Sequence, residues 1–253
     1  MCTTPTWHVS AFTHRGRVRG SNEDTIAIDG QILSGDLPAP LEFHLSGQAS
    51  ILMIADGLGG HNAGALAGRF VIEQLVKLID CTARAFDCAK AITETNQNLF
   101  DLMQQQPSLA GMGSTLVGAV LRQTELVSFN VGDSRLYLQT PLHLIQLSQD
   151  DVPEGNIDHR GRRTTRGITQ ALGGSLGFIA VEPHVTTDPL PASDETLLLC
   201  SDGLTDLVSD DAIRRVLAGA ADLSLATRRL AALAFRRGGH DNISIVVARR
   251  ERA

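Results

Sequence analysis

The sequence predicts a layered α+β fold, because strand-like and helix-like segments come in blocks instead of strict alternation. Short apolar runs bounded by polar residues indicate strands, and longer stretches with helical spacing of apolar residues indicate amphipathic helices. The 253 residues are 43% hydrophobic and 20% charged, the balance of an ordinary globule with a sizeable core. No internal repeat, low-complexity tract or linker interrupts the chain, so we expect residues 1–253 to form one domain.

The first part of the chain combines short strands with two helices. Residues 7–12 and 25–28 have the composition of strands on either side of a glycine- and arginine-rich turn, and residues 51–55 form a compact apolar run. Helical spacing follows in residues 66–79 and again in residues 88–103. Both apolar stripes are typical of helices that pack on a core.

The middle of the chain is rich in strands. Residues 115–121, 125–131 and 135–139 are separated by the short breaks RQT and GDS, which predicts an antiparallel meander. Residues 149–167 are polar and have almost no apolar periodicity. We therefore expect an exposed flap over this segment.

The last part of the chain places helices between two strands. After a short helix near residues 168–172 we expect a strand over residues 196–200, followed by two helices. Ser209 is the expected N-cap of the first of these helices, with two aspartates in its first turn, and Ser224 is the expected N-cap of the second. Residues 242–248 have the composition of a final strand.

Composition and charge exclude several kinds of protein. A net charge of −6, from 28 acidic and 22 basic residues, argues against a nucleic-acid surface, which needs a basic face. The four cysteines have the spacing of neither a zinc site nor a disulfide framework. No stretch approaches the roughly eighteen apolar residues of a membrane span, and the start MCTTPTWHVS lacks the apolar core of a signal peptide. We expect a cytoplasmic protein that binds neither nucleic acid nor membrane.

The candidate chemistry lies in carboxylates at the ends of predicted strands. These residues are Glu23, Asp24, Asp56, Asp133, Asp202 and Asp241. Asp56, Asp133 and Asp202 each lie beside a glycine, which lets backbone and ligand come close. One Asp-Gly pair alone is usually only a turn. Several such pairs on matched strands predict that the carboxylates project from rigid elements into a common site.

Close packing of these carboxylates requires a cation. Like charges within a few ångströms of one another cannot all stay ionised unless a cation neutralises them. Ligation by aspartate and glutamate oxygens, with no cysteine and no paired histidines, favours a hard cation such as Mn²⁺ or Mg²⁺ over zinc. The sequence therefore predicts a manganese or magnesium site.

Short motifs along nearly the whole chain carry a family resemblance. In order they are RGSNED, DGLGGH, GSTL, NVGDSR, ITQALGG, SDGLTD and GGHDN, which begin at Arg19, Asp56, Gly113, Asn130, Ile168, Ser201 and Gly238. Together they resemble the metal-dependent protein phosphatases, the type 2C serine/threonine phosphatases, in their bacterial form. The resemblance implies a four-layer α-β-β-α sandwich, with two stacked, mostly antiparallel sheets flanked by helix pairs and with metals between the sheet ends.

The resemblance also implies roles for individual residues. Asp56 would bridge two ions, with Asp202 and Asp241 completing the first site and Glu23 and the carbonyl of Gly57 serving the second. The other roles fall to Asp24 and Asn242 as supporting residues, Asp133 and Asp206 as ligands of a third, weaker metal, and Arg19 as the phosphate-binding residue. Asp56 and Arg19 are the expected catalytic residues, and the planar donor fork of arginine suits a phosphate.

The reaction that the resemblance implies is hydrolysis of phosphoserine and phosphothreonine by a metal-activated water, without a phosphoenzyme. The sequence agrees, because no cysteine lies in a glycine- and arginine-rich loop that would cradle an anion. Asp56 as a nucleophile is disfavoured, since a bridging metal ligand is not free to attack.

Two departures from the family pattern affect the expected mechanism. Leu58 stands where eukaryotic members have a histidine, so we expect a water on the third metal to protonate the leaving group and His61 to shape the turn. The flap over residues 149–167 is short for a bacterial member. We interpret its Asp150 and Asp151 as a solvated acidic turn.

Two alternatives from other functional classes remain. A dinucleotide-binding turn after residue 56 is disfavoured because Asn62 stands where the third glycine belongs and no strand returns after the helix. The second alternative is a catalytically inactive phosphatase-like scaffold that binds phosphoproteins or a kinase. Such a copy would be expected to lack some of the carboxylates, all of which are present. The expected partners are phosphorylated proteins, including a serine/threonine kinase or its substrates, and the resemblance favours a monomer.

Overall fold

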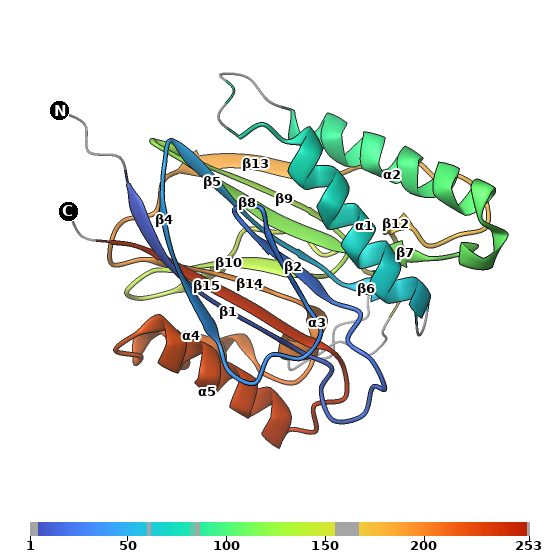
Figure 1. Ribbon diagram of the computed structural model, residues 1–253. Helices are drawn as coiled ribbons and strands as arrows, with labels where there is room; N and C mark the ends of the chain where they lie inside the picture. The colour runs from blue at the N-terminus through green and yellow to red at the C-terminus, as the bar shows by residue number, and fades with distance from the viewer. Residues whose placement is uncertain (1–4, 60–61, 82, 84–86, 155–166, 252–253) are drawn as a thin grey trace.

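The computed structural model describes residues 5–59, 62–81, 83, 87–154 and 167–251. Two six-stranded sheets lie face to face, and helices cover the outer face of each, so the molecule has four layers (Figure 1). Neighbouring strands in the described sheets pair antiparallel. The predicted α-β-β-α sandwich is confirmed.

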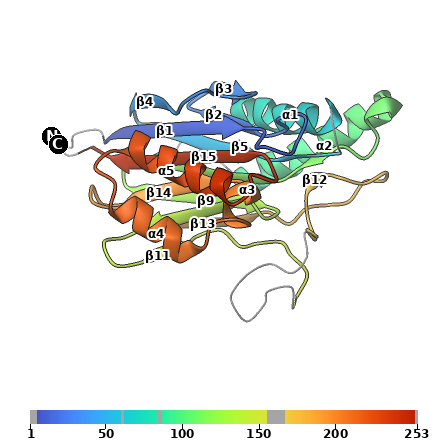
Figure 2. The ribbon, with the colours of Figure 1, turned by 90° about the horizontal axis from the view of Figure 1, so that it is seen from below.

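The first sheet has the strand order β11-β10-β14-β15-β1-β4. Its strands are β1 (Thr6–His14), β4 (Leu41–Ser46), β10 (Arg135–Gln139), β11 (Leu144–Gln146), β14 (Thr196–Cys200) and β15 (Ile243–Arg250). Strands β1 and β15 pair over their whole length, from Trp7 with Arg250 to His14 with Ile243. The beginning and the end of the described chain therefore lie side by side, as Figure 2 also shows.

The second sheet has the order β13-β9-β8-β5-β2-β3. Its strands are β2 (Thr25–Ile28), β3 (Gln31–Ser34), β5 (Ala49–Ala55), β8 (Leu116–Arg122), β9 (Glu125–Val131) and β13 (His184–Pro189). A small third sheet, β12-β7-β6, extends from the end of β5. It consists of β6 (Gly57–Leu58), β7 (Gly113–Ser114) and β12 (Leu172–Gly173).

The helices form the two outer layers. Helices α1 (Asn62–Leu78) and α2 (Cys88–Gln105) cover the second sheet, whereas α4 (Asp210–Ala218) and α5 (Leu223–Arg236) cover the first (Figure 1). A short helix α3 (Asp202–Thr205) follows β14, and a 3₁₀ turn spans Pro107–Leu109. No helix in the described ranges combines the length and the apolar character needed to cross a bilayer.

Strands with continuous apolar runs are buried on both faces. In β5, Leu52 and Ile54 pack between the two sheets, whereas Met53 points to the core beneath α1 and α2, and none of the three is exposed. In β14, Leu199 packs between the sheets and Leu198 packs under α4 and α5. Because successive strand residues point to opposite faces, an uninterrupted apolar run is the pattern of a strand with a core on each side.

The predicted meander over residues 115–139 is wrong in its last strand. Strands β8 and β9 form the expected hairpin, but β10 crosses to the other sheet and pairs with β14. Gly132 makes the crossing with φ of 97°, a conformation that glycine adopts without steric cost. Asp133 and Ser134 in the same turn are 4% and 0% exposed. The break GDS is therefore a buried crossing between sheets and not a surface hairpin.

The predicted helix near residues 168–172 is also absent. Its backbone donors go to neighbouring segments, since Thr169 N donates to the carbonyl of Asp151 at 2.8 Å and Gly173 N donates to Asn96 Oδ1 at 2.9 Å. Gly173 and Gly174 have φ of 68° and 73°, which ends any helical path. The segment is irregular and leads into β12.

One predicted helix cap is correct and one is wrong. Ser209 is the N-cap residue of α4, as expected. Helix α5, however, begins two residues earlier than predicted, with Asp222 as its N-cap. The carboxylate of Asp222 accepts a hydrogen bond from Leu225 N at 2.6 Å, so Ser224 lies inside the helix. An aspartate and a serine two positions apart are both good caps, and the local sequence alone did not separate them.

Candidate metal centre

The predicted ligands come together at one end of the two sheets. Asp56 follows β5, Asp133 follows β9, and Asp202 begins α3 just after β14. Asp241 precedes β15, and the loop before β2 carries Glu23 with its acidic neighbour. In Figure 1 these strand ends lie on the side of β6 and α3, away from both termini. The fold thus gathers acidic residues that are far apart in the sequence.

The electrostatics of Asp56 and Asp202 show that the carboxylates are close enough to repel one another. Burial is the largest cause that raises the pKa of each carboxyl well above its ordinary value. The charge of Asp24 adds most to the shift of Asp56, and the charge of Asp133 adds most to that of Asp202. Asp241 also raises both pKa values. Such a group holds extra protons unless a cation takes their place.

Asp24 is buried beside this group, and its supporting role stays a prediction. Its side chain is 1% exposed, and its Oδ2 accepts a hydrogen bond from Ser201 Oγ at 2.8 Å. Burial raises the pKa of Asp24 to about 6, and hydrogen bonds from Ser244 and Ser201 oppose the shift. The sequence prediction did not include these two serines. Ser201 adjoins a predicted ligand, so its position in SDGLTD was the available signal.

Asn242 holds the loop that carries the first ligands. Its Oδ1 accepts a hydrogen bond from Glu23 N at 2.9 Å, and its Nδ2 donates to the carbonyls of Ser21 at 2.9 Å and Arg15 at 3.2 Å. These bonds join the chain before β15 to the turn between β1 and β2. Asn242 is 4% exposed, and its supporting role at a metal site stays a prediction.

Arg19 points to the carboxylates through an ion pair. Its Nη2 donates to Asp241 Oδ2 at 2.7 Å, and this hydrogen bond is the main reason that the pKa of Arg19 is raised. The side chain is 49% exposed, so it remains open to a ligand. The neighbouring arginines turn elsewhere: Arg15 pairs with Asp36 at 3.1 Å, and Arg17 lies over an aromatic ring of α5. Arg19 thus differs from these neighbours in its contact with a predicted metal ligand, and its phosphate-binding role stays a prediction.

Glycines let the backbone segments of the site approach closely. A Cβ added at Gly57 would overlap the carbonyl of Gly64, and one added at Gly203 would overlap the carbonyl of Asn242. On α1, a Cβ at Gly64 would overlap Glu23 Oε2. Gly57 and Gly203 therefore allow backbone segments to pack closely, and Gly64 leaves room for the Glu23 carboxylate.

The two residues predicted for a third ion lie near Asp202. Asp133 is 4% exposed, whereas Asp206 is exposed at the end of α3, where its backbone N donates to the carbonyl of Asp202 at 2.8 Å. Both carboxylates contribute to the raised pKa of Asp202, after burial. The structure thus places both carboxylates beside Asp202, with Asp133 in the interior and Asp206 at the surface.

The donor set fits a hard divalent cation. Oδ1 of Asp202 is buried and has no hydrogen-bond partner, which is unfavourable for a carboxylate oxygen unless it binds a proton or a cation. Within the described ranges, no three Asp, Glu, His or Cys side chains form a closed group around one point. Mg²⁺ usually keeps several waters, so a site of this type does not require side chains on every side of the ion.

The interpretation of Asp150 and Asp151 as a solvated turn is wrong. Asp150 receives hydrogen bonds from Arg135, with Nη2 to Oδ2 at 2.6 Å and Nε to Oδ1 at 3.0 Å. Asp151 is 7% exposed, accepts from Gly132 N at 2.8 Å, and forms a hydrogen bond with His184 Nε2 at 2.8 Å. These partners lie in other segments of the chain, so the local sequence did not reveal them. His61 and residues 155–166 of the predicted flap lie outside the described residues.

Comparisons with known proteins agree with this geometry. The family model described as Protein phosphatase 2C matches residues 41–234. The serine/threonine protein phosphatase PstP of Mycobacterium tuberculosis is 33% identical over 247 residues, which cover 94% of this chain but only 44% of that protein. The serine/threonine phosphatase stp of Listeria monocytogenes is 31% identical over 260 residues and covers 96% of both chains. This chain thus spans less than half of one relative and nearly all of the other.

Solved structures show the same fold. The catalytic domain of PstP in complex with two manganese ions has a TM-score of 0.79 at 32% identity and covers 98% of this chain and 100% of that one. The phosphatase Stp1 from Staphylococcus aureus has a TM-score of 0.77 at 27% identity, with 96% and 95% covered. The predicted resemblance is confirmed, and the chain belongs to the protein phosphatase 2C family.

Proposed function

We propose that this chain is a metal-dependent phosphatase that removes phosphate from phosphoserine and phosphothreonine in proteins, without a phosphoenzyme, and that residues 1–253 act as one catalytic domain. The observation that carries the proposal is the gathering of carboxylates with raised pKa values around Asp56 and Asp202, beside an exposed Arg19. The relatives named above are serine/threonine phosphatases, and one of them is solved with two manganese ions.

Each residue at the site has a proposed task. Asp56, Asp202 and Asp241 would hold the first ion, and Asp56 with Glu23 and the carbonyl of Gly57 would hold the second. Asp24 and Asn242 would keep these groups in place. When bound, two Mn²⁺ or Mg²⁺ ions neutralise the carboxylates and supply a water of lowered pKa for attack on phosphorus. Asp133 and Asp206 are the candidates for a third ion. Arg19 binds the phosphate oxygens with its donor fork, which requires release of its pairing with Asp241.

A phosphocysteine mechanism has no support in the described part of the chain. Cys200 lies two residues before Asp202, but it is fully buried, and burial raises the pKa of its thiol to about 12. Burial also raises the pKa of the Cys88 thiol to about 12. Both thiols are neutral near pH 7 and are therefore poor nucleophiles.

We also propose the setting in which the protein works. Phosphorylated proteins, including a serine/threonine kinase or its substrates, are the proposed partners, and the chain is proposed to act as a monomer in signalling in the cytoplasm of a bacterium. Cys81, Cys88 and Cys200 carry free thiols, as is usual in a reducing compartment. The net charge of −6 supports the view that neither nucleic acid nor an anionic membrane is the partner.

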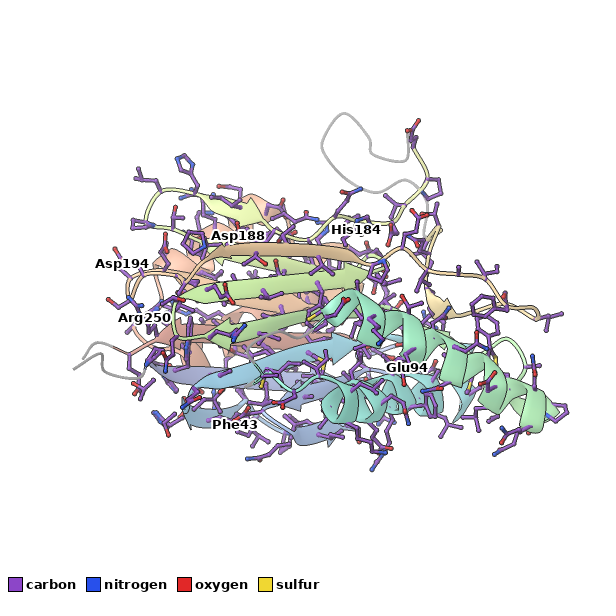
Figure 3. The ribbon with its side chains drawn as sticks, turned by 90° about the horizontal axis from the view of Figure 1, so that it is seen from above. Phe43, Glu94, His184, Asp188, Asp194 and Arg250 are labelled. Atoms are coloured by element: carbon purple, nitrogen blue, oxygen red, sulfur yellow. The ribbon has the colours of Figure 1, made fainter. Side chains whose placement is uncertain are left out.

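The proposed activity is tested with p-nitrophenyl phosphate and a phosphothreonine peptide. We expect Mn²⁺-dependent turnover of both, abolished by a chelator and restored by added Mn²⁺. Asp202→Asn should lower kcat/KM by at least about a hundredfold, because one ligand oxygen is lost. The matched variant Asp194→Asn should behave as the unchanged protein, because Asp194, labelled in Figure 3, precedes β14 whereas Asp202 follows the other end of that strand. Binding of the phosphopeptide without any turnover would instead favour the inactive scaffold.

A further inference from the structure

A groove lies beside the metal centre and has no task in the proposed reaction. Its volume is about 320 Å³, at the small end of ligand pockets, so it suits a short segment of chain. One wall is formed by Leu58 and Gly59, directly after Gly57, and the other by the strap over residues 168–181. None of the described residues that line it carries a charge. This part of the lining is therefore uncharged, although it adjoins a strongly acidic site.

The small sheet sets the distance between this groove and the metal centre. Gly57 pairs with Ser114 on β7, and Ser114 pairs in turn with Leu172 on β12. Neighbouring strands lie about 4.8 Å apart, so β12 is roughly 10 Å from Gly57. An extended chain covers this distance with about three residues. A substrate whose phosphorylated side chain reaches the carboxylates thus places its residues two or three positions away in the groove.

Buried polar side chains hold the strap in place. Asn96 on α2 is fully buried, and its Oδ1 accepts from Gly173 N at 2.9 Å while its Nδ2 donates to the carbonyl of Ile179 at 2.8 Å. At the other end of the strap, Asp151 accepts from Gln170 Nε2 at 2.9 Å. His184, which Figure 3 shows at the beginning of β13, bonds to the same oxygen of Asp151. The groove is preformed, so little ordering is needed on binding.

Apolar side chains of the strap are exposed at the groove. Ile179, which lines it, is 59% exposed, and nearby Leu176 and Phe178 are 90% and 50% exposed. Phe178 is held edge-on against Phe100 of α2, with ring centroids 5.2 Å apart. Exposed apolar residues that cluster next to a polar site are typical of a surface that binds another molecule.

We propose that this groove binds the residues two or three positions from the phosphorylated side chain and selects uncharged, apolar residues there. The proposal rests on the phosphatase function proposed above. The described lining residues offer no charged partner to an acidic or basic flank, whereas an apolar flank covers Ile179 and Leu58. The occupant is thus a phosphoprotein segment with an apolar flank, and not an acidic or basic recognition motif.

The test compares phosphothreonine peptides that are identical except at the two residues that lie two and three positions from the phosphothreonine. These two residues are both Leu, both Glu or both Lys, and they are varied first on one side of the phosphothreonine and then on the other. For the unchanged protein we expect a KM about tenfold lower with Leu than with Glu or Lys on one side, at similar kcat. Ile179→Glu should abolish this preference and lower KM for the Lys peptide, and Ile179→Lys should favour the Glu peptide. The matched variant Leu142→Glu, at a site that is 73% exposed between β10 and β11, should keep the original preference.

Turnover of p-nitrophenyl phosphate, which has no flanking residues, should be equal in all these variants. Equal KM values for all peptides with the unchanged protein would overturn the groove assignment, as would an unchanged preference in both Ile179 variants. Failure of the protein to hydrolyse p-nitrophenyl phosphate would count against the phosphatase function alone. In that case the same peptides, labelled and followed by fluorescence anisotropy, still measure whether the groove prefers Leu.

Discussion

At the scale of single residues, Gly64 decides where a charged group of the metal centre lies. It is part of α1, and the space where a Cβ would stand is taken by Glu23 Oε2. Glycine inside a helix is normally unfavourable by about 0.5–1 kcal/mol relative to alanine. The close approach of the Glu23 carboxylate gives a physical reason for glycine at this helical position.

Gly64→Ala should therefore weaken Mn²⁺ binding by about tenfold or more, because the new methyl group displaces the Glu23 carboxylate. The melting temperature of the metal-free variant should change little, because the helix preference for alanine offsets part of the cost of moving the Glu23 side chain. Isothermal titration calorimetry with Mn²⁺ measures the affinity. Gly177→Ala is the control, because a Cβ there meets nothing within 4 Å. An unchanged affinity in Gly64→Ala would show that Glu23 is not a metal ligand.

Residue chemistry made part of the site predictable. The aspartates that directly follow apolar strands lie at one end of the sheets. Their position follows from the end of the strand that carries them, which the local sequence shows. The supports were not predictable in the same way. Ser244 meets Asp24, and Asp151 meets His184, only after the sheets have formed. In the sequence alone, a buried polar residue whose partner is distant in the chain cannot be distinguished from an exposed polar residue.

At the scale of elements, the start of α5 depends on one capping residue. Asp222→Ala should lower stability by about 1 kcal/mol, because the first turn loses the acceptor for Leu225 N. For a chain of this size the melting temperature should fall by roughly 2–4 °C. Ser224→Ala, two positions later, should change it by less than about 1 °C. The reverse order of the two effects in thermal denaturation would restore Ser224 as the cap.

Elements with a core on both faces were predictable, whereas edge strands were not. Strands β5 and β14 appear in the sequence as runs without polar interruption, and the structure buries both of their faces. Strands β3, β4 and β13 lie at sheet edges and are largely exposed. Their sequences carry no strong apolar signal, because what defines them is pairing with a neighbour and not burial. The crossing of β10 to the other sheet was missed for a related reason, since strand spacing does not reveal the partner.

At the scale of the whole molecule, the two sheets bring together carboxylates that repel one another. The raised pKa values of Asp56 and Asp202 mean that the folded, metal-free protein binds protons more tightly than the unfolded chain. By linkage, stability is therefore lost as the pH rises above the usual carboxyl range of about 4, when the unfolded chain gives up its protons first. A bound cation removes this penalty.

Mn²⁺ should raise the melting temperature, and the gain should be larger near pH 8 than near pH 6. At a free Mn²⁺ concentration of about one hundred times the dissociation constant, binding adds about 2.7 kcal/mol to the free energy of unfolding. This gain corresponds to a rise in melting temperature of roughly 5–11 °C for a chain of this size. Asp202→Asn should lose most of this gain while its metal-free form melts at a higher temperature than the unchanged protein. Differential scanning calorimetry with and without a chelator measures both effects. If the metal-free Asp202→Asn variant were less stable than the unchanged protein, charge repulsion at Asp202 would not be what destabilises the metal-free fold.

The pairing of Trp7 with Arg250 places the outer ends of the first and last strands together, at the pole opposite the metal centre. A tether attached at either end would therefore hold the molecule by its far pole and leave the acidic end facing outward. An affinity tag, a solid support or a fused partner at the amino or the carboxyl side should be equally compatible with access of a bulky phosphoprotein. Orientation on a surface is thus built into the order of the strands.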